Sequence, residues 1–98
     1  MEINYKNSKI KTVCTNISEA VKKYRIEMAK KIHLRIDQLR AAESIDTLLK
    51  HSIGKCHKLK GNRKEQYAMH LEEPYRLVFV VSEGKIQIAR ILEIVDYH

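Results

Sequence analysis

The segment Tyr75-Arg76-Leu77-Val78-Phe79-Val80-Val81 decides the fold class of this chain. Successive side chains of an extended strand point to opposite faces. The odd-numbered residues of the segment therefore share one face, which is entirely aromatic or aliphatic, and the even-numbered residues share the other face. We expect the odd-numbered face to lie on the core and Arg76 to point away from it.

Two further strands are predicted on either side of this segment. Residues 67–71 alternate in the same way, and Glu72-Glu73-Pro74 breaks the pattern as a tight turn does. On the other side, Ser82-Glu83-Gly84-Lys85 is typical of a hairpin turn in which Gly84 supplies a positive φ angle. The third strand then runs from about residue 85 to residue 95. Because both connections are short, we expect three antiparallel neighbours.

The first half of the chain is predicted to be mainly helical. Glu2 to Tyr5 has the pattern of a short strand. Ser8 is a candidate cap for a helical turn through Cys14, although residues 9–13 also suit a strand. Ser18 is a good N-cap candidate for a helix that continues to Tyr24.

The clearest helix is predicted over residues 26–42. Its apolar residues recur at the spacing of one helical face: Ala29, Ile32, Ile36 and Leu39. The polar residues that lie away from this stripe are Lys30, Lys31, Arg35 and Gln38. A packed turn or short helix is expected over residues 45–49. The sequence thus predicts an α+β fold, with an N-terminal strand and helices packed on an antiparallel sheet.

Length and composition narrow the class of protein. The 98 residues are expected to form one domain, residues 1–98, with a modest core. No apolar run is long enough to cross a membrane, and residues 1–6 lack the apolar region of a secretory signal. Cys14 and Cys56 form no CxxC pair, so we expect reduced, buried thiols in a cytoplasmic protein.

The charge is large and unevenly distributed. The formal net charge is +7, which favours nucleic acid or an acidic partner. Residues 47–64 contain no acidic residue but six basic ones: Lys50, Lys55, Lys58, Lys60, Arg63 and Lys64. Solvated helical faces usually mix both signs of charge, so this one-sign segment favours a phosphate-facing patch over a merely soluble surface.

Groups that suit metal-free RNA cleavage occur in this segment and at the end of the chain. Such cleavage needs a base for the 2′-hydroxyl, an acid for the leaving 5′-oxygen and a fixed cation. His57 can titrate near neutral pH, and arginine fits phosphate oxygens. Asp96 and His98 share a face if the last strand continues, so Asp96 can orient His98, and Tyr97 can stack on a base.

Plainer interpretations of the same residues stay open. A lone histidine in a basic loop is usually an ordinary surface residue, which is the plainer interpretation of His57; His33 is expected at the surface, and His51 and His70 have no distinctive context. Arg76 can simply pair with Glu72 or Glu93, and Tyr97 can be an anchor in the core. A metal site made by Cys56, His57 and His98 is disfavoured, because adjacent Cys and His rarely give tetrahedral geometry.

The chain resembles the HigB toxins, also called plasmid maintenance system killer proteins, of the wider RelE/ParE toxin superfamily. The resemblance covers nearly the whole chain and rests on four strings: His57-Lys58-Leu59-Lys60-Gly61-Asn62-Arg63, Gln66-Tyr67, Tyr75-Arg76-Leu77-Val78-Phe79 and Glu93-Ile94-Val95-Asp96-Tyr97-His98. It implies a RelE/ParE-like toxin fold and a toxin of a type II toxin–antitoxin pair. The implied activity is cleavage of translated mRNA in the ribosomal A site, without a cofactor or metal.

The resemblance also assigns residues and partners. It implies catalytic roles for His57, Asp96, Tyr97 and His98, with proton transfer by the two histidines, and phosphate binding by Lys58, Lys60, Arg63 and Arg76. The implied partners are a HigA-like helix-turn-helix antitoxin, the ribosome with its rRNA, and mRNA, with operator DNA reached only through the antitoxin and no membrane. Relatives often carry Gly where this chain has Arg25, which bears on the start of the long helix. A ParE-like DNA gyrase poison and a non-catalytic RNA-binding module are the alternatives.

Overall fold

The computed structural model, which describes residues 1–97, contains a five-stranded sheet with the order β1-β5-β4-β3-β2. The strands are β1 (Glu2–Tyr5), β2 (His57–Lys58), β3 (Tyr67–His70), β4 (Tyr75–Ser82) and β5 (Ile88–Asp96). The antiparallel pairing of β3, β4 and β5 confirms the prediction. The sheet is nevertheless mixed, because β1 pairs with β5 in parallel. A parallel pair needs a long connection, and here the helices provide it.

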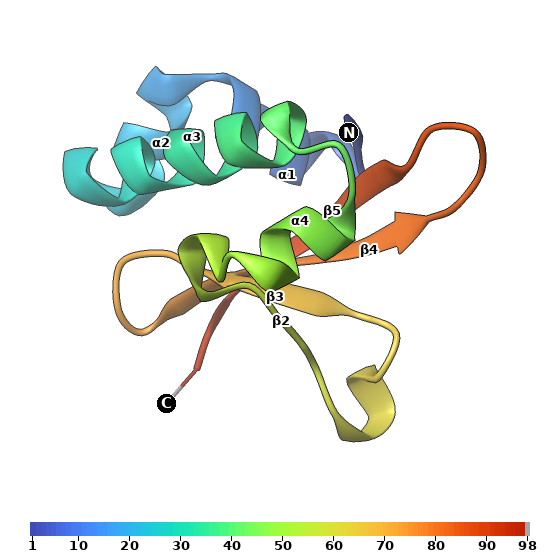
Figure 1. Ribbon diagram of the computed structural model, residues 1–98. Helices are drawn as coiled ribbons and strands as arrows, with labels where there is room; N and C mark the ends of the chain where they lie inside the picture. The colour runs from blue at the N-terminus through green and yellow to red at the C-terminus, as the bar shows by residue number, and fades with distance from the viewer. Residues whose placement is uncertain (98) are drawn as a thin grey trace.

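The helices form one layer on a single face of the sheet (Figure 1). They are α1 (Ser8–Thr15), α2 (Ile17–Tyr24), α3 (Ile26–Ala41) and α4 (Ile45–Lys50), with short 3₁₀ turns η1 (Ile53–Lys55) and η2 (Gly61–Arg63). The α+β class and the helix at residues 45–49 are confirmed. The alternative of a strand at residues 9–13 is wrong, because these residues belong to α1.

The main core lies between this helical layer and the sheet. The predicted stripe of α3 is confirmed, since Ala29, Ile32, Ile36 and Leu39 are all buried. The sheet contributes Leu77, Phe79 and Ile91, which are fully buried on the facing side. Burial of these apolar side chains supplies most of the free energy that holds the two layers together.

A second, smaller cluster lies on the opposite face of the sheet. Leu59, Ala68 and Val78 are buried there, and Leu92 and Val95 pack against them. Val78 alternates with the core residues of β4, so the predicted two-faced character of this strand is confirmed. No described helix covers this side, which we call the open face; only the segment that carries Leu59 folds over part of it (Figure 1).

The helix caps differ from the prediction by one or two residues. Asn7 caps α1, with its Oδ1 accepting a hydrogen bond from the backbone N–H of Ile10 at 3.0 Å. Asn16 caps α2 in the same way, and the hydroxyl of Ser18 donates to Asn16 Oδ1 at 2.8 Å. Asn and Ser have similar capping preferences, so local sequence did not separate the Asn from the nearby Ser.

The connection between β4 and β5 is longer than predicted. β5 begins at Ile88, so five residues, 83–87, join the strands in place of the predicted tight hairpin turn. Gly84 does not have a positive φ, whereas Gly54 and Gly61 do, at 59° and 70°. The prediction for Gly84 is therefore wrong, because a longer loop closes without a left-handed residue.

Arg25 occupies a backbone conformation that suits glycine. It lies between α2 and α3 with φ 85° and ψ 166°. This region of φ and ψ is essentially restricted to glycine, and a residue with a Cβ pays roughly 1–3 kcal/mol to stay there. Arg25 therefore lies at the boundary between α2 and α3, as expected from the glycine that relatives often carry at this position.

We predict that Arg25→Gly raises the free energy of unfolding by about 1 kcal/mol, because glycine removes the Cβ clash at this φ. Arg25→Ala is the matched control, since it removes the same guanidinium but keeps the Cβ. Urea unfolding monitored by circular dichroism measures both variants. Equal stability of Arg25→Gly and Arg25→Ala would contradict the strain argument.

Candidate active site

His57 lies at the edge of the open face. It pairs with Ala68 of β3, and directly opposed residues in an antiparallel pair share one face of the sheet. Ala68 belongs to the cluster on the open face, so the His57 side chain lies on that side. Its Nδ1 is 2.9 Å from the carbonyl oxygen of Lys55. The ring is exposed to solvent at the rim of the sheet.

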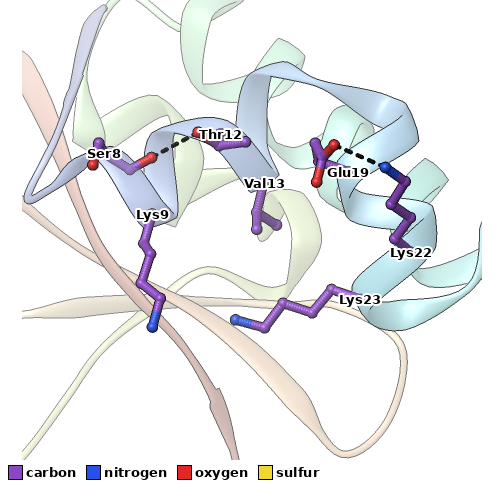
Figure 2. A pocket seen from close by; sticks show the side chains of 7 residues that line it. All are labelled: Ser8, Lys9, Thr12, Val13, Glu19, Lys22 and Lys23. Carbon is purple, nitrogen blue, oxygen red and sulfur yellow. Dashed lines mark hydrogen bonds and ion pairs between the residues drawn. The ribbon is translucent and has the colours of Figure 1, made fainter.

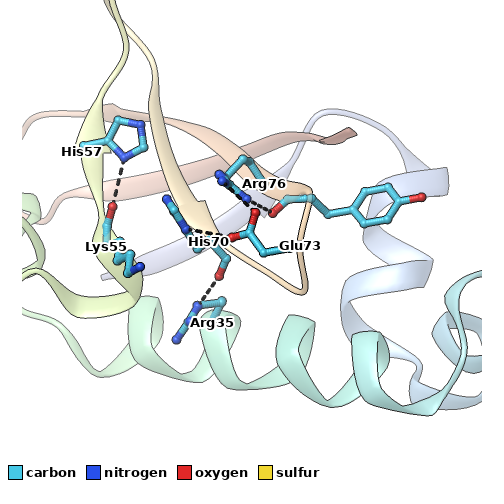
Figure 3. Close-up of polar contacts among 7 residues, drawn as sticks. Arg35, Lys55, His57, His70, Glu73 and Arg76 are labelled. Atoms are coloured by element: carbon cyan, nitrogen blue, oxygen red, sulfur yellow. Dashed lines mark hydrogen bonds and ion pairs between the residues drawn. The ribbon is translucent and has the colours of Figure 1, made fainter. Parts of the chain in front are cut away.

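His70 is a second imidazole at the same place. Its ring centroid lies 6.0 Å from that of His57, with the two ring planes at 72°. Figure 3 shows both rings on the same side of the sheet, with Arg76 on the far side of His70. His70 had no distinctive context in the sequence, and its approach to His57 follows from the pairing of β2 with β3.

Arg76 confirms the predicted direction of its side chain. It pairs directly with His70 across β3 and β4, so both residues lie on the open face. Its side chain is only 14% exposed and donates to Glu73 Oε2 at 3.2 Å and to the Tyr75 carbonyl at 2.9 Å. The predicted partners Glu72 and Glu93 are wrong, because the turn brings Glu73 closest to the guanidinium.

Glu73 bridges His70 and Arg76. Its Oε1 lies 3.3 Å from His70 Nδ1, while its Oε2 accepts from Arg76. The hydrogen bond from Arg76 is the main reason that the pKa of Glu73 is below its ordinary value. The carboxyl group is therefore ionised at neutral pH and acts as an acceptor for both neighbours.

The surroundings of His70 disfavour its protonation. Burial lowers the pKa of His70 below its ordinary value of 6.5, and the positive charges of Arg76 and Lys55 lower it further, while Glu73 opposes them. The neutral imidazole is thus the favoured form at pH 7. The unfolded chain binds this proton more readily than the folded protein, so protonation of His70 opposes folding. The resulting loss in the free energy of unfolding grows as the pH falls from 6.5 to the lower pKa of the folded state.

Arg35 connects the helical layer to this cluster. Its Nε donates to the backbone oxygen of His70 at 2.6 Å, and its Nη1 donates to Gln38 at 2.9 Å. A Cβ on Gly54 would lie 2.8 Å from Arg35 Nε, so the guanidinium also packs against the turn that precedes Lys55. Arg35 was expected to lie away from the packed stripe of α3, and it instead reaches the sheet as a half-buried side chain.

The predicted phosphate-binding cations of the basic segment are spread around the loop between β2 and β3. Arg63 donates to Glu93 at 3.0 Å and to Gln66 at 3.1 Å, so it crosses the open face to β5. Lys58 follows His57 in β2 and lies on the opposite side of the strand, while Lys60 is exposed just before η2. These side chains lie around the site, and the hydrogen bonds of Arg63 within the described residues involve neither His57 nor His70.

Asp96 and Tyr97, two of the three predicted C-terminal residues, lie at or just after the end of β5, far from β2 in the strand order. Asp96 pairs with Tyr75, whose ring packs against Tyr24 of α2 at 5.6 Å, so Asp96 is on the helix-facing side of β5. β5 is separated from β2 by β4 and β3, which at about 4.8 Å per strand spacing puts the backbones of Asp96 and His57 about 14 Å apart or more. Tyr97 is exposed and donates its N–H to Pro74 O at 3.0 Å, whereas His98 lies outside the described residues.

The remaining candidates are structural. Cys14 and Cys56 are buried free thiols, and burial raises the pKa of each to about 12, which confirms the prediction of small buried side chains. His33 was expected at the surface, yet its Nε2 is buried without a hydrogen-bond partner. Within residues 1–97, no group of three or more His, Cys, Asp or Glu side chains is arranged to hold a metal ion.

A separate pocket lies between α1 and α2 on the helical layer (Figure 2). Lys9 and Lys23 direct their ammonium groups to the same side of it, and Lys22 pairs with Glu19 at 3.2 Å. Positive charge is therefore not confined to residues 47–64. The side chains that line this pocket include no imidazole, so it does not suit proton transfer at neutral pH.

Sequence reasoning missed His70, Glu73 and Arg35. A signal for the first two was present, because His70 and Arg76 are equally distant from Glu73, at the centre of the turn between two predicted strands. That symmetry predicts a direct cross-strand pair with an acidic residue between its members. No sequence signal indicates that Arg35 bonds to a carbonyl of β3, because this contact depends on how α3 crosses the sheet.

Comparison with known proteins defines the fold. The sequence matches no family model and no curated protein. The structure has the fold of the YoeB/ParE toxins. It is similar to a YoeB/ParE toxin from Agrobacterium tumefaciens, with a TM-score of 0.65 and 19% identity over 100% of both chains. It is also similar to a chain of the YoeB–YefM complex from Staphylococcus aureus, with a TM-score of 0.62 and 22% identity over 100% of this chain and 97% of that one.

We predict that His70 titrates below pH 6.5 and that Glu73→Gln lowers its pKa further, because the lost carboxylate is the group that favours the imidazolium. Proton–carbon NMR of the imidazole Cε1–H signals across pH 4–9 measures both values, with His70→Gln used to assign the signal. A pKa at or above 6.5, or a rise in Glu73→Gln, would show that burial and the neighbouring cations do not control this ring.

Proposed function

We propose that this protein is the toxin of a type II toxin–antitoxin pair and that it is an endoribonuclease, an mRNA interferase that cleaves translated mRNA in the ribosomal A site. The observation that carries the proposal is that His57 lies beside a second imidazole, His70, which in turn pairs with Arg76, on the open face of a sheet with the YoeB/ParE toxin fold. A titratable pair next to a guanidinium meets the requirements for metal-independent transfer of a phosphoryl group within RNA.

Each residue has a role that follows from its chemistry. His57 transfers a proton, and Arg76, which has five N–H donors, uses the donors not engaged by Glu73 and Tyr75 to neutralise the phosphate. Lys60 and Lys58 are exposed cations that attract the RNA backbone. Arg63 holds the covering loop to Glu93 and offers its remaining donors to phosphate.

The C-terminal residues enter the proposal through the resemblance to HigB toxins. We propose that Asp96, Tyr97 and His98 belong to the same site, with the exposed Tyr97 suited to stacking on a base. Asp96 ends β5, which follows β4 and its Arg76 in the strand order that starts from β2. We propose that RNA runs from β2 across the open face and past the end of β5, where it would contact both groups.

The partners follow from charge and from the comparison. The net charge of +7 favours rRNA, mRNA and an acidic polypeptide. The similar Staphylococcus aureus chain comes from a complex of YoeB with YefM. We propose an antitoxin partner of the HigA-like helix-turn-helix type, through which operator DNA is reached. None of the described helices is long and apolar enough to span a membrane, and we propose a cytoplasmic location.

We predict that His57→Gln reduces mRNA cleavage by about 10²- to 10⁴-fold, the range for loss of a general acid or base. The assay maps mRNA 5′ ends and tests for 2′,3′-cyclic phosphate ends in a translating extract to which purified protein is added. His51→Gln is the matched control, since it removes an exposed imidazole from the same basic segment. Full activity of His57→Gln would defeat the assignment.

A ParE-like DNA gyrase poison is the second candidate, because the Agrobacterium tumefaciens relative is described as a YoeB/ParE toxin. Such a poison needs no ribonuclease site, and expression would trigger DNA-damage signalling before translation stops. The proposed function requires the opposite order, which pulse labelling of protein synthesis beside a DNA-damage reporter distinguishes. A non-catalytic RNA-binding module would bind without cleavage even with translating ribosomes present.

A further inference from the structure

We propose that His70 is the base of this site and that His57 is its acid. The inference rests on the proposed function and names the residue that takes the 2′-hydroxyl proton from the RNA. His70 has no distinctive context in the sequence. Among the described residues, however, it is the imidazole that lies beside His57, at 6.0 Å between ring centroids.

Hydrogen bonds select the reactive nitrogen of both rings. His57 Nδ1 faces the Lys55 carbonyl oxygen at 2.9 Å, and His70 Nδ1 faces Glu73 Oε1 at 3.3 Å. Both partners are acceptors, so Nδ1 carries the hydrogen in each ring. In the neutral rings Nε2 therefore holds the lone pair, and in the protonated rings Nε2–H is the proton to be donated.

The groups around His70 favour the base role. Lys55 from η1, Arg76 from β4 and Arg35 from α3 are cations near the ring or its backbone, and Glu73 is the opposing anion, with His57 facing from β2. Burial and the cations lower the pKa of His70, so its Nε2 is unprotonated at pH 7. His57 is the more exposed of the two rings, at the rim of the sheet.

The strand order makes the C-terminal strand a poorer source of the second proton-transfer group. Asp96 is three strand spacings from β2 and on the helix-facing side, opposite to the open face. His70 is one strand away from His57 and on the same face. A single scissile phosphate adjacent to His57 is thus within reach of His70 without rearrangement of the sheet.

The reaction balances with these two groups alone. Nε2 of His70 removes the proton of the 2′-hydroxyl, and the 2′-oxygen forms a bond to phosphorus. The bond from phosphorus to the 5′-oxygen breaks, and that oxygen takes the proton from Nε2 of His57. The products are a 2′,3′-cyclic phosphate and a 5′-hydroxyl, no electron is transferred, and water later returns the proton between the rings. Arg76, paired with His70 in the sheet, neutralises the phosphate oxygens.

Two contacts hold His70 in place for this step. Glu73 fixes the ring through Nδ1, and Arg35 fixes the backbone carbonyl of the same residue. Glu73 is itself held by Arg76, so ring, carboxylate and guanidinium form one connected network. Proton transfer by His70 and the stability that this network provides are measured separately in the experiment.

The test uses ribosomes programmed with an mRNA that carries a sulfur in place of the 5′-bridging oxygen at the mapped cleavage site. A thiolate leaves without a proton, because a thiol is far more acidic than an alcohol. On natural mRNA, His70→Gln and His57→Gln should both lose about 10²- to 10⁴-fold in rate. On the sulfur-containing mRNA, His57→Gln should recover to near the wild-type rate, while His70→Gln should stay slow.

Further variants and readouts make the result decisive. The acidic limb of the pH–rate profile, which reports protonation of the base, should vanish in His70→Gln, while His51→Gln should keep the wild-type profile. Circular dichroism and thermal unfolding check that each variant is folded. His70→Asn should lose cleavage activity as His70→Gln does, which would show that the loss does not come from one particular replacement side chain.

The proposal is overturned if His70→Gln cleaves natural mRNA within about twofold of wild type. It is also overturned if His70→Gln recovers on the sulfur-containing mRNA while His98→Gln does not, since His98 would then be the base. These outcomes leave the endoribonuclease assignment intact. Absence of cleavage by the wild-type protein would instead remove the proposed function, and this inference with it.

Discussion

The site depends on a very short strand pairing. Only two residue pairs, His57 with Ala68 and Lys58 with Tyr67, join β2 to the sheet. A shift of one residue in this pairing would turn His57 to the other face. The N–H of Leu59 bonds to Gln66 O at 2.8 Å, and the Leu59 side chain packs on Ala68 and Val78, so a small apolar cluster keeps the register that the two pairs alone would hold weakly.

The two faces of the sheet differ in what covers them. The helical layer buries one face of the sheet and leaves the other face to strands and loops (Figure 1). Among the described residues, two polar networks lie on the open face: Glu73 bridges His70 and Arg76, and Glu93 pairs with Arg63. Each acidic residue fixes the orientation of a cationic or imidazole side chain that would otherwise sample several rotamers. Catalysis requires such preorganised side chains.

Much of the fold was predictable because it follows from local pattern. The stripe of α3 and the alternation in β4 each predicted burial correctly, since the period of apolar residues reports which side meets the core. The parallel pairing of β1 and the loop before β5 were not predictable in this way, because strand partners and loop lengths depend on contacts distant in the sequence. The open-face direction of Arg76 was correct, but its partner Glu73 depended on the shape of the turn.

The sequence by itself determined the fold class, the basic character of residues 47–64 and the face of its strand on which Arg76 lies. These features follow from side-chain period and charge, which each segment carries on its own. Only the tertiary structure decided that His70 meets His57, that Glu73 joins His70 to Arg76, and that Arg35 supports them from α3. Strand register and helix crossing set these contacts, and both are properties of the packed chain as a whole.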